Sequence, residues 1–374
     1  MLTSVNTTDN SIPSLNQAFL RQTEAYLQAA VAPQAAQLDH DSEALRQAFL
    51  ALGDRNLLAL RITAPGQATG LDDLSFRAFQ ELVARYSGAL AFLQIQHQSA
   101  AALIAQSQNL ALKQDYLPFL ANGQKRVGLG FSQLRRAGEP LVKATTIPNG
   151  YQLQGEVPWI TGHGCFQSFI IGATMPDGQA LYGLMPFTAS TQAGGSIAFS
   201  PPLQLAAMAS TNTVTATVQN WVLDQSQIVM IQPAEAIHQS DRKNALHHSF
   251  FALGCARAGL DILAGQSTKA VTAAFAALDR ELSICRQQIY QAEPTEAVLS
   301  QRLKLRAWAI DLAGRCSQAA VAVSRGAANH TNHPAQRIYR EALAFTVFGQ
   351  TTAVMEATLL QLSRQAQLCV DFTQ

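Results

Sequence analysis

The chain has 374 residues, of which 48% are hydrophobic and 14% are charged, and its formal net charge is +1. This length exceeds a typical single hydrophobic core, so we expect two or three domains. The charges are nearly balanced and no long run of Lys or Arg occurs, which argues against electrostatic binding to nucleic acid or to an anionic membrane surface. No apolar run is long enough to span a bilayer, so we expect no membrane insertion.

The cysteines and the start of the chain bear on its compartment. The five cysteines are scattered and lack the paired spacing of metal sites, and they stand at Cys165, Cys255, Cys285, Cys316 and Cys369. We interpret them as small buried apolar residues in a reducing compartment, and we expect no metal site. Residues 1–15 are polar and have no apolar segment, so they do not resemble a signal peptide and are expected to be loosely attached. A soluble cytoplasmic protein is predicted.

Residues 1–127 are predicted to form an N-terminal α-helical domain. Apolar residues recur at helical spacing from about Leu15 to Phe49. A loop rich in Gly and Pro follows at 63–70, and Asp72 or Asp73 can cap the next helix. Helices are then expected at about 72–86, 90–107 and 111–121.

Residues 128–232 are predicted to form a middle β domain. The period changes to alternation, and the turn signals Pro148-Asn-Gly150 and Pro176-Asp-Gly178 separate apolar or alternating runs. Residues 211–218 alternate Thr and Val, as in a half-exposed strand. This density of turns favours a compact β-barrel or sandwich.

Residues 233–374 are predicted to form a C-terminal four-helix bundle, because the helical period returns after Pro233 and persists nearly to the end. The four helices are expected at about 242–277, 278–291, 295–328 and 334–368.

Four local runs, in their order and spacing, resemble the acyl-CoA dehydrogenase family, which is flavin-dependent. They are Gln114–Gly123, Gly150–Gly162, Leu253–Asp261 and His333–Ala342. The resemblance implies an α+β fold with an N-terminal helical domain, a middle β domain and a C-terminal four-helix bundle. It also implies FAD as cofactor, an acyl-CoA or another small apolar substrate, and a homodimer or homotetramer that shares cofactor contacts between subunits.

The run Trp159-Ile160-Thr161 ends the stretch that resembles the family's cofactor hairpin. The resemblance implies that the indole of Trp159 packs on the flavin and that Ile160 lies beside it. The Thr161 hydroxyl would donate a hydrogen bond to the reactive edge, which stabilises negative charge on the reduced ring. The alternative is that Trp159 fills the core and Thr161 is an ordinary residue at a strand end.

Two further segments would complete the cofactor site by the same resemblance. One is the loop that begins with Phe131, Ser132 and Gln133, and the other is the run before the last helix that contains Thr351. The loop departs from the family pattern, since Arg135 and Arg136 follow and Glu139 stands where a small hydroxyl is usual. The two arginines could bind a pyrophosphate or be solvated, whereas an unpaired carboxylate would repel it.

The glutamate that removes the substrate proton in this family has no counterpart at its usual place. That position is Gly349, and the alternative position on the first bundle helix falls near Asn244 or Ala245, neither of which is a base. Among the histidines, His163 is a weak candidate base, with a structural role as the alternative.

Three functions stay open at this stage. The first is a flavin-dependent oxidoreductase of acyl-CoA dehydrogenase type with altered or lost dehydrogenase chemistry, a divergent member without the glutamate. The second is a non-catalytic relative that acts as a scaffold or binding protein. The third is a flavin monooxygenase on the same fold.

Overall fold

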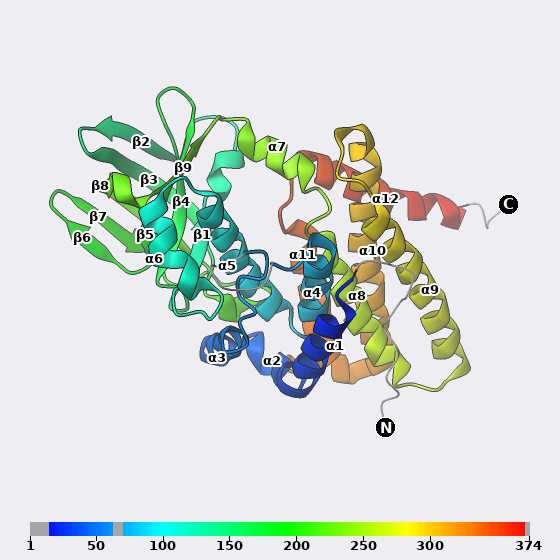
Figure 1. Cartoon of the computed structure of the whole chain (residues 1–374). Helices are drawn as coiled ribbons and strands as arrows, with labels where there is room; N and C mark the ends of the chain where they lie inside the picture. Colours follow the sequence, from blue (N-terminus) through cyan, green and yellow to red (C-terminus); the bar gives the residue numbers. More distant parts are fainter. Residues whose placement is uncertain (1–14, 63–69, 371–374) are drawn as a thin grey trace.

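The computed structural model describes residues 15–62 and 70–370, apart from the side chains of residues 296 and 364–370. The predictions for residues 1–14 and 63–69, and for the Cys369 side chain, lie outside the described part. Figure 1 shows three blocks, with the sheet at one end, the last helices at the other and the N-terminal helices between them. The type of element changes from helix to strand at Val127 and back to helix after Gln232.

The N-terminal block is helical, and its caps follow from the sequence. Asp72 accepts a hydrogen bond from the backbone N–H of Ser75, which starts α4 where the acidic pair predicts it. In the periodic stretch from Leu15 to Phe49, α1 runs through a π-helical segment (Leu27–Val31) and a 3-10 segment (Ala32–Gln34) into α2, and a turn at 39–40 precedes α3. The helices are α1 (Gln17–Tyr26), α2 (Ala35–Leu38), α3 (Ser42–Gly53), α4 (Asp73–Tyr86), α5 (Gly88–Gln106) and α6 (Leu110–Leu120).

Within the described residues, nine strands form one sheet in the order β6-β7-β8-β3-β2-β4-β5-β9, with β1 added in parallel to β4. The turn at 148–150 joins β2 to β3, and Gly150 has φ +152° with the Leu223 carbonyl 2.1 Å from where a Cβ would stand, so only glycine fits. The strands are β1 (Val127–Gly130), β2 (Val142–Ile147), β3 (Gly150–Ile160), β4 (Ser168–Thr174), β5 (Ala180–Pro186), β6 (Ser190–Gln192), β7 (Gly195–Phe199), β8 (Val214–Asp224) and β9 (Ile228–Gln232).

The C-terminal block has more helices than the four that the periodicity predicts. The expected boundary at 277/278 is wrong, because the chain breaks instead near Gly265, and Thr268 caps the next helix by accepting from Val271 N–H. The expected continuous helix at 334–368 is also wrong, because Gly349 turns the chain with φ +53°. The helices are α7 (Ala236–Lys243), α8 (Ser249–Ala264), α9 (Lys269–Gln291), α10 (Leu299–Ser324), α11 (Pro334–Val347) and α12 (Thr352–Val370).

One buried carboxylate, Asp39, connects all three blocks. Asp39 follows α2, and its side chain accepts from the backbone N–H of Met208, 2.9 Å away, and from the guanidinium of Arg340 on α11. Nearby, the buried Glu341 accepts from the N–H of Gly88 at 2.9 Å, which ties α11 to the start of α5. The blocks are therefore held together by polar contacts as well as by the shared apolar core.

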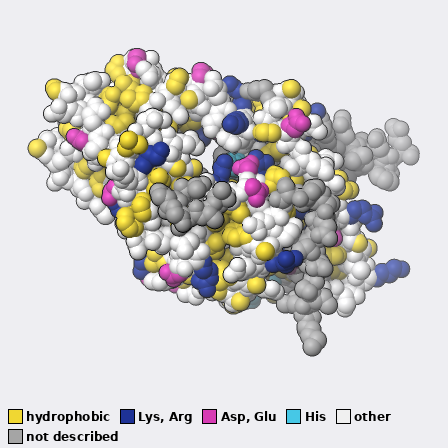
Figure 2. All heavy atoms as spheres, viewed as in Figure 1, with side chains coloured by type: hydrophobic (Ala, Val, Ile, Leu, Met, Phe, Trp, Pro, Cys, Tyr) yellow, Lys and Arg dark blue, Asp and Glu magenta, His cyan; other side chains and the backbone are white. Residues whose placement is uncertain are grey.

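The described residues include no helix that is long and apolar enough to cross a membrane, and no group of three or more His, Cys, Asp or Glu placed to hold a metal ion. Cys165, Cys255, Cys285 and Cys316 are buried free thiols, which confirms their interpretation as small core residues. On the face shown in Figure 2, acidic and basic side chains are interspersed and do not form a patch of one sign.

Candidate functional site

The end of β3 carries the three residues that the sequence assigned to the flavin. Trp159 is 39% exposed, whereas Ile160 is fully buried, as expected for neighbours on opposite faces of a strand. The pairing with β8 is irregular between Val157 and Ile160, which marks the end of regular sheet there. The indole thus presents a surface to a potential ligand, whereas Ile160 belongs to the core.

The Thr161 hydroxyl is engaged inside the protein. It is 1% exposed, and its Oγ1 lies 3.0 Å from Oγ1 of Thr213, which in turn lies 3.4 Å from Oγ1 of Thr211. The Thr211 hydroxyl donates to the carbonyl of Met208. A carbonyl only accepts, so each hydroxyl in this chain finds its acceptor in the next, and Thr161 donates to Thr213. In this arrangement the hydroxyl proton of Thr161 points toward Thr213 and is not available to a flavin.

The loop after β1 is held mainly by its own side chains. Gln133 is buried and donates from Nε2 to the carbonyl of Gly172 at 2.7 Å, and its Oε1 has no partner among the described residues. The ring of Phe131 packs edge-on against Tyr182 at 5.3 Å between centroids. Ser132, by contrast, is exposed. Of the three predicted residues here, Ser132 is the one with a freely accessible side chain.

Two of the charged residues of this loop, Arg135 and Glu139, form ion pairs within the protein. Arg135 donates to both carboxylate oxygens of Asp241 on α7, at 2.8 and 2.9 Å, so its charge is matched within the protein. Arg136 is exposed. Glu139 is paired with Lys143, which lowers the pKa of that carboxyl and removes part of the expected repulsion toward a phosphate.

Position 349 has no room for a side chain. A Cβ on Gly349 would lie 2.3 Å from Cε1 and 2.6 Å from Nδ1 of His248, at the start of α8. Atoms of two residues cannot approach so closely without displacing one of them, so the imidazole occupies the space into which a carboxylate at 349 would extend. Nothing local in the sequence shows this contact.

A buried arginine fixes the backbone around the same point. Arg306 on α10 donates to the carbonyls of Ala245, Phe348 and Gly349, at 3.0, 2.6 and 3.0 Å. Burial lowers the pKa of Arg306 to about 10. Burial, together with the charge of Arg306, also lowers the pKa of His248 well below its ordinary value, so this imidazole is neutral at neutral pH.

Aromatic rings fill the space on the other side of this turn. The ring of Phe348 lies 4.1 Å from that of Phe92 on α5, and it meets Phe345 edge-on at 5.3 Å. Phe345 stacks in turn on Phe251 of α8 at 5.8 Å. These contacts join residues far apart in the sequence, and the resulting wall beside Gly349 is apolar.

The remaining residues singled out from the sequence are held by contacts within their own parts of the fold. Thr351 caps α12, since its hydroxyl accepts from the N–H of Val354 at 3.3 Å. Ala245 is buried and Asn244 is exposed at the end of α7. His163 follows Thr161 and packs between Phe187 and Phe199 at 5.2 and 5.4 Å, and burial lowers its pKa.

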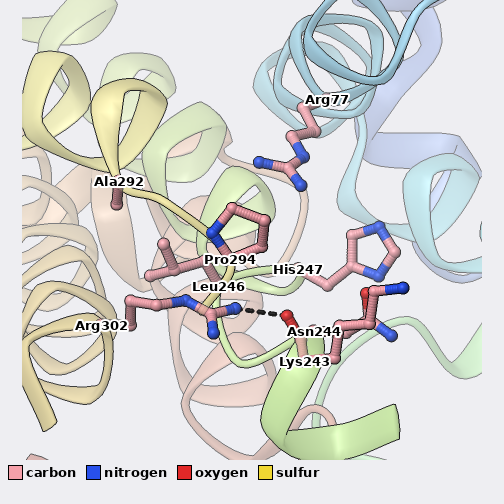
Figure 3. A pocket seen from close by; sticks show the side chains of 8 residues that line it. All are labelled: Arg77, Lys243, Asn244, Leu246, His247, Ala292, Pro294 and Arg302. Atoms are coloured by element: carbon pink, nitrogen blue, oxygen red, sulfur yellow. Dashed lines mark hydrogen bonds between the residues drawn. The ribbon is translucent and has the colours of Figure 1, made fainter. Parts of the chain in front are cut away.

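A small basic hollow lies beside α7. Figure 3 shows Arg77 reaching toward it from α4 and Arg302 from α10, where Arg302 donates to the carbonyl of Lys243, with His247 close by. The space is about 10 Å³, which is room for about one water molecule. Neither this hollow nor the larger cavity lined by His163 includes Trp159, Thr161 or Gly349 in its walls.

Comparison with known proteins agrees with this architecture. The family model described as the acyl-CoA dehydrogenase N-terminal domain matches residues 14–124. The mitochondrial isovaleryl-CoA dehydrogenases of Bos taurus and Pongo abelii are each 36% identical over 165 residues, which is 41% of this chain. The likeness in sequence to the acyl-CoA dehydrogenases is thus shown for the N-terminal domain and for these 165 residues. The match spans 38% of the length of each of these two relatives.

Solved structures of two acyl-CoA dehydrogenases show the same fold along 96% of the chain. Butyryl-CoA dehydrogenase from Megasphaera elsdenii superposes with a TM-score of 0.75 at 19% identity, covering 96% of this chain and 100% of that one. A glutaryl-CoA dehydrogenase in complex with glutaryl-CoA gives 0.77 at 18% identity, covering 96% and 97%. The helical, β and helical order predicted from the sequence is thereby confirmed.

Proposed function

We propose that the protein is a flavin-dependent oxidoreductase that works without a carboxylate at position 349. The match of residues 14–124 to the acyl-CoA dehydrogenase N-terminal domain and the similarity to isovaleryl-CoA dehydrogenase support the flavin-dependent, oxidoreductase kind. The observation that carries the rest of the proposal is the contact between Gly349 and His248, because it leaves no space for a base of the usual kind. Residue 349 therefore cannot be the base that removes a proton from an acyl-CoA.

The residues present fit a flavin in some respects. The exposed indole of Trp159 offers a flat face, Ser132 offers a hydroxyl, and Arg136 offers a cation for a pyrophosphate. A bound FAD would supply hydride transfer. The Thr161 hydroxyl fits less well, because it would have to leave Thr213 before it could donate to a ligand.

The group that replaces the missing carboxylate in space is the neutral imidazole of His248. Neither ring nitrogen has a hydrogen-bond partner among residues 15–62 and 70–370 of the structure. A neutral imidazole has a free lone pair that can accept a hydrogen bond or a proton, and its lowered pKa makes His248 a weaker base than an ordinary histidine. The cations Arg306 and Arg135 that act on it electrostatically would favour an anion formed nearby.

The first test is the visible spectrum of the purified protein, before and after addition of FAD. Flavin absorbance is expected, and Trp159→Ala should weaken FAD retention at least tenfold, while Trp159→Phe, which keeps a flat ring, should retain most of it. A protein that carries no flavin and takes up none on incubation would refute the proposal.

A second candidate function is a non-catalytic relative that serves as a scaffold or binding protein. The observation that favours it is the 4.1 Å contact between Phe92 and Phe348, which closes the space beside Gly349 with protein side chains. Turnover of any substrate with a flavin-dependent readout would remove this candidate. Reduced-flavin-dependent incorporation of oxygen would instead identify the predicted monooxygenase.

The substrate, the assembly and the location are parts of the same proposal. An acyl-CoA or another small apolar substrate is proposed from the similarity to isovaleryl-CoA dehydrogenase and to a glutaryl-CoA dehydrogenase in complex with glutaryl-CoA. A homodimer or homotetramer is supported by apolar side chains on α11 and α12 that are 41–59% exposed, namely Leu343, Val347, Met355, Leu359, Leu360 and Leu362. A cytoplasmic location remains a prediction from the sequence.

A further inference from the structure

A cavity of about 190 Å³ lies at the junction of the N-terminal helices and the β block. Its walls come from the start of α3, the middle of α5 and the turns that follow β3 and precede β8. For comparison, an apolar cavity of about 150 Å³ in another protein holds a benzene molecule. The space therefore suffices for a small organic molecule.

The cavity is polar. Ser42, Glu43 and Arg46 contribute from α3, His163 and Asn212 from the two turns, and Leu93 is the one large apolar side chain among the lining residues. Neither ring nitrogen of His163 has a partner among the described residues, and burial keeps the ring neutral, so one nitrogen can donate. A polar cavity of this size holds water or a ligand rather than remaining empty.

Its wall is rigid, because the two turns are tied to each other. The backbone N–H groups of Gly162 and His163 donate to the carbonyls of Thr211 and Asn212, and the Asn212 side chain donates back to the carbonyl of His163. Asn212 adopts φ +45°, in the left-handed region that Asn takes more readily than other residues with a Cβ. These bonds hold the two turns in place before any ligand arrives.

Only part of the Arg46 guanidinium is hydrogen-bonded to described residues. Its Nε and Nη2 donate to the two carboxylate oxygens of Glu43, at 2.8 and 2.7 Å, and its Nη1 has no partner among the described residues. Arg85 has the same arrangement and binds a second carboxylate as well. Its Nε and Nη2 donate to Asp261, and its Nη1 donates to Glu24 at 2.8 Å. In the cavity, the place of that second carboxylate is taken by no described residue.

We infer that this cavity binds a small organic carboxylate, held by Nη1 of Arg46 and by the imidazole N–H of His163. The hydroxyl of Ser42 and the amide of Asn212 supply further hydrogen bonds, and Leu93 contacts the apolar part of the ligand. The site is separate from the proposed flavin face at Trp159, so the binding does not depend on the proposed function.

Calorimetric titration of the full chain with acetate, butyrate and benzoate tests the inference, with benzamide as the neutral counterpart of benzoate. At least one carboxylate is expected to bind saturably, and benzamide is expected to bind at least tenfold more weakly. Arg46→Gln should weaken carboxylate binding about 10- to 100-fold, the range for a hydrogen bond to a charged group. His163→Phe, which keeps the packing of the ring, should weaken it about three- to tenfold.

Two controls separate this site from general charge effects. Glu43→Gln should strengthen carboxylate binding, because it removes a like charge and weakens the competing ion pair, whereas Arg136→Gln should leave it unchanged. The Glu43 side chain is 63% exposed and that of Arg46 is 32% exposed, so their ion pair contributes little to stability and the Arg46→Gln and Glu43→Gln variants should fold. The inference is overturned if no carboxylate of the panel binds, if benzamide binds as well as benzoate, or if Arg46→Gln leaves the affinity unchanged.

Discussion

The contact between Gly349 and His248 predicts a specific loss of stability when a methyl group is added at 349. In Gly349→Ala, the left-handed backbone conformation, φ +53°, costs about 1 kcal/mol for a residue with a Cβ. The methyl group would lie 2.3 Å from the imidazole, and relief of such overpacking costs about 1–3 kcal/mol more. We therefore expect a decrease of about 2–4 kcal/mol in the free energy of unfolding.

The two contributions can be separated by variants of this chain. Gly194 has φ +80°, and a methyl group on it would meet nothing within 4 Å, so Gly194→Ala should show the backbone cost alone, about 1 kcal/mol. In the double variant His248→Ala, Gly349→Ala the overlap disappears. Its decrease in the free energy of unfolding should therefore be about 1–3 kcal/mol smaller than the sum of the decreases in the two single variants.

Urea unfolding followed by circular dichroism measures these differences, with the midpoints converted through a common slope. If Gly349→Ala costs no more than Gly194→Ala, or if the two changes at 248 and 349 are additive, the imidazole does not occupy the space beside 349. The account of the missing carboxylate would then be wrong. Gly349→Glu, the larger change, should for the same reason fail to introduce acyl-CoA dehydrogenase activity.

Three further outcomes are expected. Asp39→Ala leaves the buried Met208 N–H without its acceptor and the Arg340 guanidinium without its carboxylate, so it should cost about 3–5 kcal/mol in urea unfolding, and a cost below about 1 kcal/mol would contradict this. Burial lowers the pKa of His97 from 6.5 to about 4, so its contribution to stability is complete above pH 6.5 and falls by about 1.4 kcal/mol per pH unit as the pH drops toward 4. His97→Gln should reduce the slope of stability against pH by about that amount, the other buried histidines supplying the remainder, and an unchanged slope would exclude the role. Leu360→Glu should reduce the sedimentation coefficient toward that of a monomer, whereas Leu110→Glu, at a similarly exposed position on α6, should not; a wild-type chain that sediments as a monomer would refute the oligomer.

Local signals explain which elements the sequence predicts well. Asp72 marks the start of α4, and the turn at 148–150 marks the hairpin that ends at Trp159, because capping and turn chemistry depend on neighbouring residues. The C-terminal helices were harder to divide. The apolar period runs on through Phe348, and a single glycine at 349 gives little sign that the chain turns there.

The candidate site was predictable only in part. The absence of a carboxylate at 349 follows from the sequence, but the imidazole that fills its space comes from a residue about a hundred positions away. Likewise, the hydroxyl chain that occupies Thr161 joins two segments of the β block, and the ion pair that occupies Arg135 reaches α7. Such contacts depend on tertiary packing, for which a single sequence carries no local signal.

The carboxylate of Asp39 has a consequence for chimeric proteins. Because it receives hydrogen bonds from both other blocks, the N-terminal helices cannot be exchanged as an independent module. A graft from a relative would need an acidic residue at the same place, or compensating changes at Met208 and Arg340. Libraries built by recombining this chain with its relatives should therefore yield folded progeny mainly where positions 39 and 340 descend from the same parent.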